Sequence, residues 1–86
     1  MHANTITTLE IIGDTIEPGS PVHDAMYNLM SSLRKQVQDV TVDQARLLSQ
    51  TIQAIKAFAS LEDEHQWALE DELSHNIHAV TRNLTS

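Results

Sequence analysis

The chain has 86 residues, a formal net charge of −7 at pH 7, no cysteine, two glycines and two prolines. Because binding to nucleic acids and to anionic membrane surfaces relies on Lys and Arg, this charge argues against both as direct partners. The lack of cysteine excludes disulfides and thiolate metal sites, and the scarcity of turn residues and aromatics argues against a β-sheet protein. We therefore predict an all-α protein whose core depends on association between helices.

Neither a membrane span nor a signal peptide is apparent. No stretch approaches the roughly 18 consecutive apolar residues of a transmembrane helix, and the first residues lack a basic start followed by an apolar run. We expect a cytoplasmic protein that makes no membrane contact.

Residues 1–19 are predicted to form an N-terminal arm. Its β-branched residues, with Gly13-Asp14 at a possible turn, fit a short β-hairpin. An irregular helix with Leu9, Ile12 and Ile16 on one side fits equally well. A third alternative is an arm that becomes ordered only on a partner.

A first helix is expected to begin at Ser20 and Pro21, since Ser suits the N-cap and Pro suits the first helical position. Its apolar residues share one side and form a stripe, which comprises Val22, Met26, Leu29, Met30, Leu33, Val37 and Val40. We place the following turn near residues 39–42, because Thr41-x-x-Gln44 is a capping-box pattern. A short turn makes the two helices antiparallel neighbours, so the stripe should cover the next helix.

Residues 41–84 read as one amphipathic helix with two apolar faces when residues are placed 100° apart. A short face comprises Ala45, Leu48, Ile52, Ile55 and Ala59, and a long face continues from Leu47 and Ala54 to Leu84. The sequence thus predicts an antiparallel helical hairpin over residues 20–86 with one long C-terminal helix. The alternative is a compact three-helix bundle with a break near Ser60, where Ser60-x-x-Asp63 is a second capping-box pattern. We favour the continuous helix because residues 58–62 offer little other turn chemistry.

In a continuous helix, most of the long face would be uncovered in a monomer. The first helix would reach only about half of its longer neighbour, so another copy of the chain would have to cover the remainder. We therefore predict a homo-oligomer, most simply a dimer, whose interface consists of Phe58, Leu61, His65, Leu69, Leu73, Ile77, Val80 and Leu84.

The most specific surface feature is an acidic cluster around a tryptophan. Six of the twelve Asp and Glu residues lie between positions 62 and 72, and no Lys or Arg occurs in residues 57–81. Helical spacing places Trp67 beside the carboxylates one turn before and after it, and these five residues form the predicted partner-binding site: Trp67, Asp63, Glu64, Glu70 and Asp71. An exposed aromatic with a charged rim is typical of a protein-binding hot spot. The alternative is that Trp67 packs on a neighbouring helix while the carboxylates only solvate the surface.

Other chemistry has weaker support in the sequence. Glu62-x-x-His65 and Glu72-x-x-His75 match the unit of di-iron bundles, but on one helix they point about 80° apart, so we predict no metal and no cofactor. No glycine-rich phosphate loop or catalytic triad pattern is present, so we predict no enzymatic activity. A candidate ligand-binding site for an anion consists of Tyr27, Arg34 and Lys35.

The function predicted from the sequence is that of a non-enzymatic, small acidic helical protein. It would self-associate and bind a protein partner with a basic surface, as an inhibitor, anti-activator, chaperone or adaptor does. The alternative is an oligomer that binds a nucleotide or another small anionic molecule between subunits, around Arg34 and Lys35.

Overall fold

The computed structural model describes residues 3–36 and 40–85, and these residues form four helices and no strands. The helices are α1 (Ala3–Gly13), α2 (Pro21–Lys35), α3 (Val42–Ala59) and α4 (Asp63–Thr85). The prediction of an all-α protein is confirmed. Within the predicted turn near residues 39–42, Asp39 lies outside the described residues, as does Val37 of the predicted stripe.

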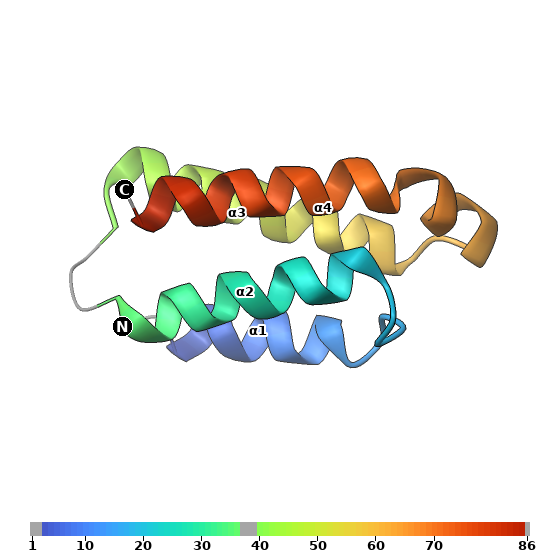
Figure 1. Ribbon diagram of the computed structural model, residues 1–86. Helices are drawn as coiled ribbons and strands as arrows, with labels where there is room; N and C mark the ends of the chain where they lie inside the picture. The colour runs from blue at the N-terminus through green and yellow to red at the C-terminus, as the bar shows by residue number, and fades with distance from the viewer. Residues whose placement is uncertain (1–2, 37–39, 86) are drawn as a thin grey trace.

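The helices form two antiparallel hairpins stacked in two layers, α1 with α2 and α3 with α4 (Figure 1). The α1–α2 turn and the α3–α4 turn lie at the same end of a bundle that measures 39 × 20 × 18 Å. Between the layers, α2 packs along α4 and α1 packs on α3. Among the described residues the backbones of α2 and α3 do not approach each other closely, so the expectation that these two helices are neighbours is wrong, although the stripe of α2 shares one core with Leu48 and Ile55 of α3.

Two helix starts follow from local capping chemistry and confirm the sequence prediction. Ser20 is the N-cap of α2, where its hydroxyl accepts a hydrogen bond from the Val22 N–H at 3.2 Å, and Pro21 is the first helical residue. Thr41 caps α3 through a reciprocal capping box, in which its hydroxyl accepts from the Gln44 N–H and the Gln44 side chain accepts from the Thr41 N–H. Such caps satisfy N–H groups that have no partner inside the helix.

The N-terminal segment is helical, which confirms the helix alternative and excludes the β-hairpin over the described residues. Leu9, Ile12 and Ile16 are buried, and they join a core built mainly on the stripe of α2. In that stripe Val22, Met26, Leu29, Met30 and Leu33 are all buried. Residues 3–16 therefore contribute directly to the hydrophobic core.

The prediction of one continuous C-terminal helix is wrong. The chain instead breaks near Ser60, as in the alternative of a compact bundle. α3 ends at Ala59, and after three residues α4 returns antiparallel to it. The turn is held by the Phe58 carbonyl, which accepts hydrogen bonds from the Leu61 N–H at 3.0 Å and from Gln66 Nε2 at 3.0 Å. The Ser60 hydroxyl donates to the Lys56 carbonyl at 3.1 Å, so Ser60 ends α3 and does not begin α4.

The physical reason for the reversal is long-range burial. Folding back buries Ile77 and Leu84 of α4 in the same core as Phe58 of α3. Each large apolar side chain removed from water contributes roughly 1.5–3 kcal/mol, which outweighs the weak turn chemistry of residues 60–62. The reversal also places Asp63 and Glu64 in the first turn of a helix, where the helix macrodipole favours carboxylates.

Candidate functional site

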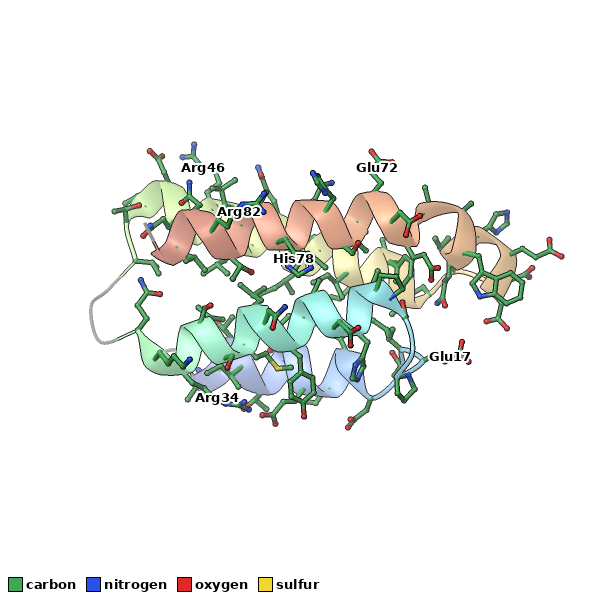
Figure 2. The ribbon with its side chains drawn as sticks, viewed as in Figure 1. Glu17, Arg34, Arg46, Glu72, His78 and Arg82 are labelled. Atoms are coloured by element: carbon green, nitrogen blue, oxygen red, sulfur yellow. The ribbon has the colours of Figure 1, made fainter. Side chains whose placement is uncertain are left out.

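The two hairpin turns gather negative charge at one end of the bundle, which we call the acidic end. The α1–α2 turn contributes Asp14 and Glu17, and Figure 2 shows Glu17 at this end. The first turn of α2 contributes Asp24, and the α3–α4 turn with the first turns of α4 contributes Glu62, Asp63, Glu64, Glu70, Asp71 and Glu72. The sequence prediction missed Asp14, Glu17 and Asp24, because they belong to segments that approach α4 only after folding.

Positive charge lies mainly at the opposite end. Arg34 and Lys35 are in the last turn of α2, Arg46 is near the start of α3, and Arg82 is in the last turn of α4. Figure 2 shows Arg46 and Arg82 together at this end of the upper layer, with Glu72 farther toward the acidic end. The bundle therefore carries most of its positive charge at one end and most of its negative charge at the other. The exceptions are Lys56 in the last turn of α3, Asp43 in the first turn of α3, and Glu10, which pairs with Arg34.

Trp67 lies in the second turn of α4 with 61% of its surface exposed. Asp63, Glu64 and Asp71 are also exposed, whereas Glu70 is half-buried. Glu70 Oε2 accepts a hydrogen bond from the Ser20 hydroxyl at 3.5 Å, so its carboxylate lies at the N-terminus of α2. Trp67 is thus exposed on the described chain and does not pack on a helix of its own chain. Packing of Trp67 on a helix of another subunit stays a prediction.

The residues of the predicted oligomer interface divide into a buried and an open group. Phe58, Ile77 and Leu84 are buried in the core of their own chain, and Leu73 and Val80 pack against it as partly buried side chains. Leu61 is half-buried, His65 is exposed and Leu69 is 45% exposed. Fold-back of α4 therefore removes the ground on which a second copy was expected, an uncovered long face, and self-association stays a prediction.

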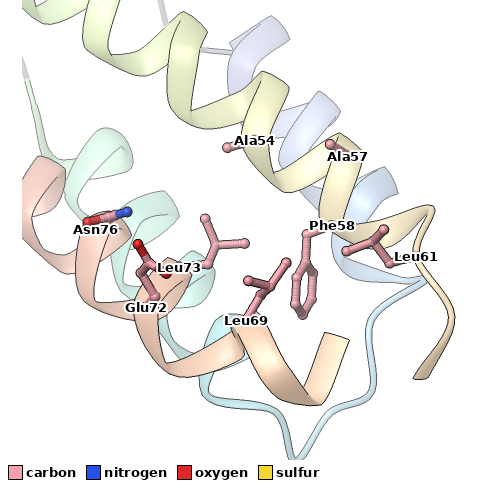
Figure 3. A pocket seen from close by; sticks show the side chains of 8 residues that line it. All are labelled: Ala54, Ala57, Phe58, Leu61, Leu69, Glu72, Leu73 and Asn76. Atoms are coloured by element: carbon pink, nitrogen blue, oxygen red, sulfur yellow. The ribbon is translucent and has the colours of Figure 1, made fainter. Parts of the chain in front are cut away.

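Leu61 and Leu69 of the open group border an apolar hollow of about 300 Å³ between α3 and α4, and His65 does not line it. Figure 3 shows Phe58, Leu69 and Leu73 pointing into this space, with Ala54 and Ala57 on its α3 wall. A second hollow of about 350 Å³ shares Ala54, Leu73 and Asn76 with the first and continues along the helices to Leu47 and Val80. Together the two hollows form one channel on the outer face of the second hairpin, which we call the α3/α4 groove.

The predicted anion site is not brought together. Tyr27 and Arg34 line one hollow with Glu10, Asp14 and His23, whereas Lys35 lines a different hollow with Ser32, Gln36 and Leu84. The guanidinium of Arg34 donates to Glu10 Oε1 at 2.6 Å. The Glu10 carboxylate is thus already paired with the Arg34 guanidinium that an anionic ligand would need. The Asp14 carboxylate lines the same hollow.

The paired Glu and His motifs do not form a metal centre in the described part of the chain. No three His, Asp or Glu side chains described by the structure are close enough together to hold a metal ion. Among residues 3–36 and 40–85, no helix combines the length and the apolar character that a membrane crossing needs.

Comparison of the chain with family models, with curated proteins and with solved structures found no match.

Proposed function

We propose that this protein is a non-enzymatic binding protein that attaches to a basic surface of another protein through its acidic end. The observation that carries the proposal is the position of Trp67, whose indole is 61% exposed at an end of the bundle crowded with carboxylates. Exposing an indole to water is unfavourable, and Trp is among the residues most enriched at the centres of protein interfaces. The proposed function is of the inhibitor, anti-activator, chaperone or adaptor kind.

The charges around Trp67 support a basic partner for two reasons. Carboxylates from the α1–α2 turn and from α4 present one sign of charge, which accelerates the approach of a cationic surface and repels an anionic one. Trp also offers its aromatic face to an Arg or Lys side chain, an attraction that strengthens when the pair is desolvated. A segment rich in Arg or Lys therefore fits this end of the bundle better than an apolar or acidic segment.

The test selects 12-residue peptides from a displayed random library against the full chain and measures their affinity by the emission of Trp67, the only tryptophan in the sequence. We expect selected peptides to be rich in Arg and Lys, and their binding to weaken as salt screens the charges. Replacing Trp67 by alanine should weaken the binding about thirtyfold, the loss typical of a hot-spot residue. Because this variant has no tryptophan, its binding is followed with a labelled peptide.

Tyr27 offers a matched control, because its side chain is 59% exposed on a different helix. The Tyr27→Ala variant should bind the selected peptides as the unmodified protein does. Peptides without an excess of Arg and Lys, or equal losses in the two variants, would contradict the proposed function.

A further inference from the structure

The α3/α4 groove has the residue spacing of a surface made to receive another helix. On the α3 side, five lining residues follow one another at alternating steps of three and four, namely Leu47, Gln50, Ala54, Ala57 and, in the turn after α3, Leu61, and Thr51 and Phe58 also line the hollows beside them. On α4 it is lined by Leu69, Glu72, Leu73, Asn76, Ala79 and Val80. Steps of three and four residues mark the line along which one helix faces another in coiled-coil packing.

This line overlaps only in part with the line that each helix uses for the core, since Phe58, Leu73 and Val80 contribute to both. The buried core residues of α3 are Leu48, Ile55 and Phe58, and of these Phe58 alone also borders the groove. On α4, Ile77 and Leu84 serve the core and do not line either hollow. Each of the two helices therefore has a second contact line, and between Leu47 and Leu61 that line is about 21 Å long, or four helical turns.

The exposed apolar residues and the net charge of the chain fit a single helix from another protein in the groove better than they fit a second copy of this chain. Leu69 and Leu47 line the groove with 45% and 37% of their surface exposed, and the other exposed large apolar residues, Ile11, Tyr27, Val42 and Trp67, each lie on a different helix in the described chain. A second copy therefore has no row of protruding apolar side chains to fill the channel. Two grooves placed face to face would enclose empty space, and each copy has a net charge of −7.

The charges along the groove define the chemistry and direction of the inserted helix. Glu72 lines the hollow that contains Leu61 and Leu69, next to the acidic end. Among the described residues that line the two hollows, Glu72 is the one charged side chain, and Arg46 at the other end of the bundle lines neither hollow. In the middle, the side-chain amides of Gln50 and Asn76 offer hydrogen bonds that an entirely apolar helix would leave unmade.

We propose that the α3/α4 groove binds one amphipathic helix of about four turns from a partner protein. The helix presents an apolar ridge to the groove, a polar side chain to Gln50 and Asn76, and Lys or Arg at the end that lies over Leu61 and Leu69. This surface is separate from the one around Trp67, which the rotation along α4 places on the opposite side of that helix.

The experiment uses three labelled 16-residue peptides as probes and measures binding by fluorescence anisotropy. The first has leucines at steps of three and four, a central glutamine and lysines at one end. The second has the same composition with the leucines scrambled, and the third has glutamates in place of the lysines. We expect the first peptide to bind at least tenfold more tightly than the other two.

Variants then locate the peptide on the protein. Replacing Leu69 by lysine, or Ala57 by tryptophan to fill the groove, should weaken binding of the first peptide at least tenfold while circular dichroism stays helical. Ile11→Lys is the matched control, because Ile11 is an exposed apolar residue on α1. It should leave binding unchanged. The proposed function is tested separately, by Trp67→Ala with the peptides selected from the random library, so the two proposals can fail independently.

Direction is tested with a nitroxide on the basic end of the first peptide. In NMR spectra of the labelled protein it should broaden the resonances of Leu61 and Leu69 more than those of Leu47. Broadening at Leu47 instead, or equal binding of the scrambled peptide, would overturn the proposal. A doubled mass in sedimentation that Leu69→Lys returns to 9.6 kDa would also overturn it, because a second copy would then occupy the groove.

Discussion

Replacing Ile77 by alanine should lower the free energy of unfolding by about 2–5 kcal/mol. Ile77 is fully buried in the middle of α4, where it belongs to the core that also contains Leu29 of α2 and Ile55 of α3. Truncation removes the transfer free energy of three methyl or methylene groups and leaves a cavity that the surrounding helices fill only in part. Urea denaturation followed by circular dichroism measures the change.

His75 provides the control on the same helix, because its side chain is exposed. His75→Ala should change the free energy of unfolding by less than about 0.5 kcal/mol, as surface substitutions usually do. An Ile77→Ala variant no less stable than His75→Ala would mean that Ile77 is not buried by fold-back of α4.

Proline substitutions at two positions of α4 should differ by about 2 kcal/mol or more in the free energy of unfolding that they cost. Asp63 is the first residue of α4, a position at which the N–H has no helical partner and proline is accepted. We expect Asp63→Pro to change the stability by less than about 1 kcal/mol. Ser74→Pro lies in the helix interior, where proline removes a hydrogen bond and clashes with the preceding turn, so it should cost about 3 kcal/mol or more.

The same pair distinguishes the two alternatives for residues 58–65. In a helix that continued through Ser60, Asp63 would be an interior position and its proline variant would be as damaging as Ser74→Pro. Asp63→Ala is the control for loss of the carboxylate at the helix start, which is worth about 0.3–1 kcal/mol. Equal destabilisation by the two prolines in thermal unfolding would show that the break is absent.

The helix starts could be predicted from the sequence because capping is local. Ser20 with Pro21, and Thr41 with Gln44, satisfy N–H groups within three residues of the cap, so the sequence alone contains the information. The reversal at residues 60–62 could not be predicted in this way, since burial of Ile77 against distant residues decides it. One local signal was available: Glu62, Asp63 and Glu64 together are typical of the first turn of a helix.

For the candidate site, too, the sequence contains the local part of the arrangement and lacks the part that depends on contacts between distant segments. Spacing along one helix predicts carboxylates beside Trp67, and α4 contains Asp63, Glu64, Glu70 and Asp71, but Asp14 and Glu17 reach the same end from another hairpin. Arg34 and Lys35 were grouped because they are adjacent in sequence. Adjacent residues on a helix point about 100° apart, and the structure places these two in different hollows.

The combination of a charged end and an apolar groove on one small bundle suggests how the two proposed surfaces would cooperate. The hollow that contains Leu61 and Leu69 opens next to the acidic end, so a basic segment held near Trp67 could continue into a helix seated in the groove. Two contacts on one partner raise the affinity through effective concentration without a new kind of interaction. Loss of either Trp67 or Leu69 would then weaken the same natural complex by different mechanisms.

Small-angle X-ray scattering, combined with light scattering for the mass, tests the fold-back of α4 most directly, and both proposed surfaces depend on it. The structure has a Cα radius of gyration of 12.3 Å and a longest dimension of 39 Å. We expect a particle of these dimensions, slightly enlarged by hydration. A maximum dimension of roughly 60 Å, the length of an unbroken helix of about 40 residues, would contradict the account.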